Sequence, residues 1–269
     1  MKKRLQKSGP FVTKTLGELT LVDEPSLKHV GIYHDLKKVL LDANSTFRIL
    51  DEDSPRWDRA LFLNLTFWGA NSGGDILVDD ELPADVVTHV ALHHLAAKAV
   101  GAKPGDTLTP RALFLGESIA SAFDAYLVGR ILGHNDASSF LETQVPAMAE
   151  AAEGAGLAGE DFDALLQDFS KDPDRAFGDL RSLLYDATLA VFEARSAEAA
   201  HAALLTFDER RLAPLLHHYE LSNWVLYARA YGAVNPEMDA RVLEIDTALR
   251  SAKEPVEWLA QSWLTHKTS

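Results

Sequence analysis

The chain has 269 residues, no cysteine, 47% hydrophobic and 25% charged residues, and a formal net charge of −14 at pH 7. This is the composition of an ordinary globular protein that can form a large core without covalent cross-links. Because cysteine is absent, disulfides and thiolate metal sites are excluded, and any metal ion must be bound by imidazole and carboxylate groups. The acidic balance repels phosphate backbones and anionic lipids, so we expect neither a nucleic-acid nor a membrane partner.

Two segments have features of targeting or membrane sequences. The basic start, Met1–Arg4, is not followed by the apolar stretch that a signal peptide needs. The most apolar long segment, 112–132, contains Glu117, Asp124 and Arg130, and these charges disfavour a membrane span of about 20 apolar residues. We therefore expect a cytoplasmic protein.

Strand patterns are confined to the first 80 residues. Leu16–Val22 has the composition of a short strand, whereas the apolar spacing of Ser26–Leu41 predicts a helix. In Ala60–Trp68, Asn and Thr alternate with Leu and Phe, which indicates a second strand. The turn-forming residues Gly69–Gly74 and the apolar segment Asp75–Val78 follow, so a hairpin with a six-residue loop is predicted.

Helical patterns occupy most of the chain after Pro83. Pro83 and Gly101 are typical of a helix start and stop around 84–100, and Thr109–Pro110 opens a helix that runs to about Leu132. Further helices are expected near 139–154, 160–170, 174–195, 197–206, 209–232, 236–251 and 254–265. The predicted fold class is α+β and predominantly helical, with a small N-terminal sheet beside the His-containing helix and a C-terminal helical bundle.

Two histidines and a glutamate on consecutive predicted helices form the strongest candidate site. His89 and His93 are four residues apart, so both project from one helix face and can share a metal ion. Glu117 lies 24 positions later among small apolar residues of the next helix, where a carboxylate is costly unless it has a partner. The alternative is that the histidines are core residues and Glu117 a surface residue near the helix start.

This arrangement resembles a known family of enzymes. A hairpin, a His-x-x-x-His helix and a second helix with Glu, over about 60–133, look like the core of the gluzincin zinc metallopeptidases, and His93-His94-Leu95 resembles the extension of their motif. The resemblance implies that His89, His93 and Glu117 bind zinc. The family motif is His-Glu-x-x-His, and Val90 stands where its catalytic Glu is expected. Ser121 likewise replaces an Asp that many members have.

Val90 cannot accept a proton, so a catalytic base must come from elsewhere. His94, four residues after Val90, and Asp85, one turn before His89, are the candidate catalytic residues. The alternatives are a packing or supporting role for His94 and an interaction of Asp85 with the helix dipole. Asp124 either hydrogen-bonds a ligand histidine or is solvated.

A second group of aromatic and histidine residues occurs near the C-terminal end. His217–Glu220 is followed at helical spacing by Trp224, Tyr227 and Tyr231. Such a stripe packs in a core or covers a pocket.

Three functions fit these residues. The first is a zincin-like metalloprotein with one divalent ion, Zn²⁺ expected, that acts as a metal-dependent hydrolase without being a His-Glu-x-x-His peptidase. The second is a mononuclear non-haem Fe²⁺ oxygenase, whose facial triad is also two histidines and a carboxylate. The third is an inactive binding or regulatory protein. The expected partner is a peptide or small-molecule substrate, and the oligomeric state is left open.

The same argument gives an expected domain organisation. Residues 1–136 would form the zincin-like domain with its hairpin and two metal-site helices. Residues 137–269 would form the C-terminal helical region, packed as one body with the first.

Overall fold

The fold is described from a computed structural model, which covers residues 7–8, 11–50, 76–77, 79–103, 105–135 and 137–264. Contacts divide the chain into two compact units, Met1–Ala91 with Pro104–Asp106, and Leu92–Lys103 with Thr107–Ser269. The division falls inside one continuous helix, α4 (Ala84–Ala99). The domain boundary expected near residue 136 stays a prediction, because this division is no test of independent folding.

The first unit contains two small sheets. In the larger sheet the order is β1-β2-β4-β5, with antiparallel pairs except for parallel β4 and β5. Its strands are β1 (Lys7–Ser8), β2 (Phe11–Thr15), β4 (Thr46–Leu50) and β5 (Ile76–Leu77). The buried residues Phe47 and Ile49 alternate along β4, as in a strand with one face in the core. In the smaller sheet, β3 (Thr20–Val22) pairs in parallel with β6 (Glu81–Pro83).

Several N-terminal predictions need correction. The expected strand Leu16–Val22 is extended only in β3; Leu16–Glu18 is a 3-10 turn, because the Glu18 carboxylate accepts a hydrogen bond from the Thr15 N–H at 2.9 Å. The expected helix Ser26–Leu41 is split by a turn into two elements, α1 (Glu24–Leu27) and α2 (Tyr33–Asp42).

The predicted hairpin is only partly covered by the structure. The strand predicted at Asp75–Val78 is present at Ile76–Leu77, where it pairs in parallel with β4. The predicted strand Ala60–Trp68 and turn Gly69–Gly74 lie outside the described residues.

The second unit is helical, and several of its helices begin or end at the capping, proline and glycine residues that the sequence indicates. Gly101 ends α4 with φ of +83°, a conformation that glycine adopts readily. Side-chain caps begin five helices, with Thr109, Ser138, Asp172, Ser196 and Asn235 each accepting from a first-turn N–H. The helices are α5 (Pro110–Ile131), α6 (Ser139–Gly154), α7 (Gly159–Lys171), α8 (Pro173–Glu193), α9 (Ala197–Leu205), α10 (Leu221–Tyr231), α11 (Pro236–Ser251) and α12 (Pro255–Leu259).

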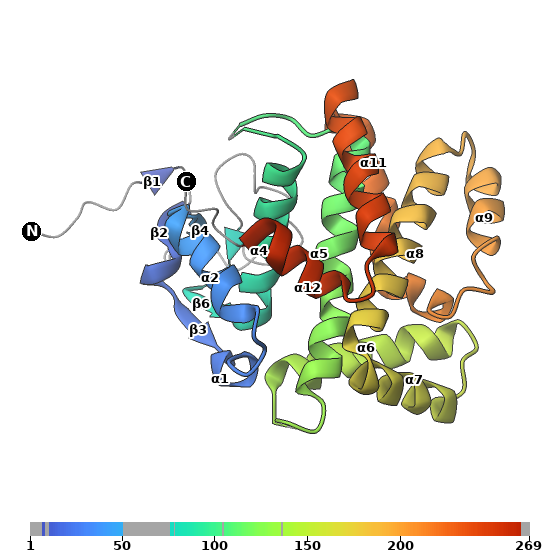
Figure 1. Cartoon of the computed structure of the whole chain (residues 1–269), viewed down its shortest axis with the longest axis horizontal. Helices are drawn as coiled ribbons and strands as arrows, with labels where there is room; N and C mark the ends of the chain where they lie inside the picture. The colour runs from blue at the N-terminus through green and yellow to red at the C-terminus, as the bar shows by residue number, and fades with distance from the viewer. Residues whose placement is uncertain are drawn as a thin grey trace, which may run out of the picture. The chain divides into compact units, whose positions relative to one another are not determined.

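Helix α5 is the centre of this unit and packs against α8, α7, α10 and α11 (Figure 1). It is long and apolar enough to cross a membrane by length and composition alone, but 83% of its most apolar window is buried inside the protein. The apolar composition of α5 is therefore explained by its position in the protein core. The predominantly helical α+β fold class is thereby confirmed.

Two predicted helices are interrupted. The expected helix 209–232 consists of the 3-10 turn η2 (Ala213–His218) and α10, separated where Tyr219 is extended. The buried residues Leu216 and Leu221 are five positions apart, which does not keep them on one face of a single helix. The expected helix 254–265 is α12 followed by a π-helical turn, Ala260–Leu264.

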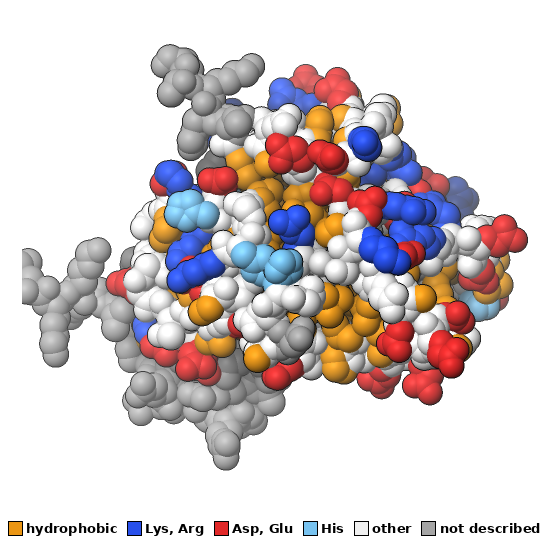
Figure 2. All heavy atoms as spheres, turned by 60° about the horizontal axis from the view of Figure 1, so that its bottom comes forward, with side chains coloured by type: hydrophobic (Ala, Val, Ile, Leu, Met, Phe, Trp, Pro, Cys, Tyr) orange, Lys and Arg blue, Asp and Glu red, His pale blue; other side chains and the backbone are white. Residues whose placement is uncertain are grey.

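A charge network links α8 to α11. The Arg181 guanidinium, 1% exposed, donates to the Asp246 carboxylate, and Arg250 donates from Nε to Asp246 at 2.9 Å and from Nη2 to Asp186 at 2.6 Å. On the face shown in Figure 2, basic and acidic side chains lie interspersed around apolar patches. We call Arg181, Asp186, Asp246 and Arg250 the arginine network.

Candidate metal centre

The three residues predicted as metal ligands form one cluster. His89 and His93 lie one turn apart on α4, and Glu117 lies on α5. One ligand atom from each residue can be chosen so that all lie within 4.8 Å of one another. We call these residues the metal cluster, and it can hold a metal ion.

His93 and Glu117 form a close pair within the metal cluster. Nε2 of His93 lies 3.5 Å from Oε2 of Glu117. Two ligand atoms bound to one tetrahedral Zn²⁺ at about 2.1 Å are about 3.4 Å apart, so this pair already has the spacing of bound ligands. The Gly116 backbone lies against the other side of the ring, since a Cβ there would be 3.4 Å from Nδ1 of His93. The sequence therefore sets a small residue beside the ring and the carboxylate at Nε2.

His89, the third ligand, lies on the same helix as His93. His89 and His93 are separated by one helical turn, a spacing at which two imidazoles reach one ion. The cluster's 4.8 Å spread exceeds the ligand separation of a tetrahedral ion, so metal binding requires a small inward rotation of the side chains. All three residues are partly exposed, with 21% and 23% of the His93 and Glu117 side chains accessible. Water or a substrate can therefore approach the cluster.

His94 lies outside the metal cluster. It is exposed, and on a helix it is turned by about 100° from His93 and about 140° from His89. Partial desolvation and the charge of Lys98 lower the pKa of His94, which favours its neutral form. Its role as a catalytic base stays a prediction, and its direction on α4 does not favour it.

Asp85 also lies outside the cluster, although it shares the helix face of His89. Burial, together with the charge of Asp23, raises the pKa of Asp85 to about 6, although hydrogen bonds from the N–H groups of Asp85 and Val86 partly oppose the shift. The charge of Asp85 in turn contributes to the raised pKa of Tyr33. The Asp85 carboxylate therefore lies near the start of α1 and the start of α2, and its catalytic role stays a prediction.

Tyr227 of helix α10 interacts electrostatically with Glu117, an interaction that the sequence did not indicate. The loop after α10 is tied to the start of α5, because the Ala233 N–H donates to the Leu108 carbonyl at 2.9 Å. Within α10, burial raises the pKa of Tyr227, and the charges of Tyr231 and Glu117 raise it as well. Tyr227 therefore lies in the electrostatic field of Glu117 with its phenol protonated. In the sequence, the spacing of Trp224, Tyr227 and Tyr231 along one helix face was the feature that could have pointed to this interaction.

The surroundings of the remaining sequence candidates differ. Trp224 is a core residue, 8% exposed. Asp124 is partly buried, and its charge adds to the burial that raises the pKa of Tyr219 well above the usual value. Ser121, at the position where many gluzincins have Asp, is buried in α5.

Comparison of the chain with protein-family models, with curated proteins and with solved structures gives no match. The resemblance to gluzincins stays a prediction that rests on the short motif alone.

Proposed function

We propose that the chain is a mononuclear metalloprotein whose ion is bound by His89, His93 and Glu117. The observation that carries this proposal is the convergence of three ligand atoms within 4.8 Å, two from α4 and one from α5. Two imidazoles and a carboxylate form a donor set that suits Zn²⁺ and Fe²⁺. With three protein ligands at a partly exposed position, the ion would keep coordination sites for water or substrate.

We further propose a zincin-like, metal-dependent hydrolase that differs from His-Glu-x-x-His peptidases, with a peptide or small molecule as substrate. A bound Zn²⁺ would polarise a carbonyl and lower the pKa of water. Glu117 and the two histidines would fix its position, and Val90 would leave the neighbouring space apolar. His94 and Asp85 remain the proposed proton acceptors, through water rather than by direct contact.

The donor set also favours a second candidate, a non-haem Fe²⁺ oxygenase. Two histidines and one carboxylate are the ligands of that class, and such an enzyme has no need of a base at position 90. The third candidate is a binding or regulatory protein that retains the metal.

Paired activity assays distinguish these candidates. Zinc-loaded protein is assayed for cleavage of a peptide library, and iron-loaded protein for oxygen uptake with 2-oxoglutarate, each beside His89→Ala. The hydrolase proposal predicts cleavage that His89→Ala abolishes and no oxygen uptake. Oxygen uptake that depends on His89 would replace it with the oxygenase. Inactivity in both assays with metal still bound would support the binding protein.

A further inference from the structure

A second candidate site lies entirely within the helical unit. A hollow of about 500 Å³ is lined by the end of α8, by α9, by η2 and by the start of α10. Its wall forms where Tyr219 breaks the helix expected over 209–232. The volume is in the range of pockets that bind small molecules. None of the metal-cluster residues lines this hollow, which we call the α9 pocket.

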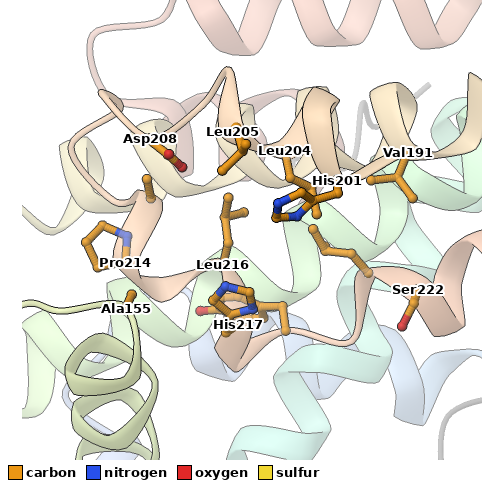
Figure 3. Close-up of a pocket in the computed structure, with 13 residues that line it drawn as sticks. Ala155, Val191, His201, Leu204, Leu205, Asp208, Pro214, Leu216, His217 and Ser222 are labelled. Atoms are coloured by element: carbon orange, nitrogen blue, oxygen red, sulfur yellow. The ribbon is translucent and has the colours of Figure 1, made fainter. Parts of the chain in front are cut away.

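Leucines of α9 and η2 face each other across part of the pocket wall. Leu204 and Leu205 project from α9 toward Leu216 of η2 (Figure 3). Leu205 is 52% exposed, although burial of such a side chain is worth about 1.5–3 kcal/mol. Because this exposed leucine faces a concave apolar surface, an apolar ligand could cover it without rearranging the helices.

Among the described residues, the polar side chains of the pocket are few and include no lysine or arginine. His201 of α9 and His217 of η2 point into the hollow from opposite sides, and Ser222 and Asp208 lie toward its two ends (Figure 3). The ring nitrogens of an imidazole can form hydrogen bonds with a hydroxyl group.

Charge argues against an anionic ligand. None of the 13 described lining residues is a lysine or arginine, and Asp208 is an acid. The net charge of −14 further repels anions. With no fixed cation to pair with a carboxylate or phosphate, the pocket fits a neutral polar group better.

We propose that the α9 pocket binds an uncharged amphipathic molecule with an apolar body and one hydroxyl group. The body packs against Leu204, Leu205 and Leu216. The hydroxyl exchanges hydrogen bonds with His201 or His217. This inference is independent of the metal cluster and of the proposed function.

The probe is 1-octanol, titrated into the full chain with labelled leucine methyl groups and followed by NMR. Saturable shifts are expected for the methyl groups of Leu204, Leu205 and Leu216. The exposed leucines Leu226 and Leu243, which do not line the pocket, should not shift. Octanoate, with the same apolar chain but a carboxylate, should bind at least tenfold more weakly. Octanoate binding as tight as that of 1-octanol, or shifts that do not saturate, would overturn the proposal.

Variants locate the site. Ala213→Trp fills the hollow and should abolish the shifts, whereas Ala240→Trp, on the exposed side of α11, should leave them unchanged. His217→Phe keeps the apolar volume but removes a hydrogen bond, so binding should weaken about 3- to 10-fold. If Ala213→Trp disturbs the fold, Leu205→Gln at its half-exposed position must weaken binding instead. Unchanged affinity in His217→Phe and Leu205→Gln would contradict the assignment.

Discussion

The arginine network and the metal cluster both place charged or ligand-forming groups between helices, but their surroundings differ. Arg181 is 1% exposed, and Asp246 accepts from two guanidinium groups. In the metal cluster, His93 and Glu117 are more than a fifth exposed, and their closest pair is 3.5 Å apart. Breaking a buried charge pair is costly, because the remaining charge is left in the interior without its partner. Partly exposed ligand groups that need only a small rotation of their side chains can instead accept an ion without unfolding.

The largest expected effect is on activity at the exposed cluster. Val90→Glu introduces the carboxylate that the gluzincin motif has, and general-base assistance typically accelerates a reaction 10²- to 10⁴-fold. If the scaffold is a hydrolase that lacks this base, peptide cleavage by the zinc-loaded variant should appear or rise by about that factor. Val90→Gln, which has similar size but no basic carboxylate, is the matched control. Equal rates in the two variants would contradict the hydrolase account.

The next effect is on stability at the arginine network. Asp246→Ala leaves Arg181 buried without its carboxylate and should lower the free energy of unfolding by about 3–5 kcal/mol. Urea unfolding of the metal-free protein measures this change. Glu244→Ala, at an exposed position two residues earlier on α11, should change it by less than about 0.5 kcal/mol. Similar values for both variants would remove the distinction between the two regions.

A pH effect is expected from Asp85. Its pKa of about 6 in the folded protein exceeds the unfolded value of about 3.9, so the folded state holds this proton more tightly. The resulting stability is complete below about pH 4 and is lost as the pH rises through about 6. Asp85→Asn should therefore stabilise the metal-free protein at pH 7, by up to about 3 kcal/mol, with no gain near pH 4. The exposed Asp35→Asn should show no such profile; a flat profile for Asp85→Asn would show that the carboxylate is ionised without cost.

The smallest expected effect returns to the metal cluster. Glu117→Gln and His93→Ala remove a partly exposed pair, so the metal-free protein should lose no more than about 1 kcal/mol of unfolding free energy. Chemical denaturation in the presence of a chelator measures this. A loss as large as that of Asp246→Ala would mean that the cluster is a structural pair rather than a ligand site.

Local signals in the sequence account for the elements that were predicted correctly. Gly101 and Thr109–Pro110 mark the end of α4 and the start of α5, and the four-residue spacing of His89 and His93 follows from helix geometry alone. That Glu117 meets them follows from two consecutive helices packing against each other. These features depend on short stretches of chain.

The features that were missed depend on distant residues. Arg181 and Asp246 are 65 positions apart, and nothing in either segment specifies the other. The influence of Glu117 on Tyr227 follows from the packing of α10 on α5. The break at Tyr219 is set by burial on both sides of it, which a periodic pattern does not reveal. The position of His94 could be predicted from sequence, because helix geometry turns it away from the face shared by His89 and His93.

The most direct test of the account is the metal content of protein purified without added metal and then dialysed against Zn²⁺. The wild-type chain should bind about one equivalent, and His89→Ala, His93→Ala and Glu117→Ala should each bind close to none. His201→Ala, at an exposed histidine outside the metal cluster, should retain full occupancy. No bound metal in the wild type, or full occupancy in the three ligand variants, would contradict the assignment of His89, His93 and Glu117 as a metal site.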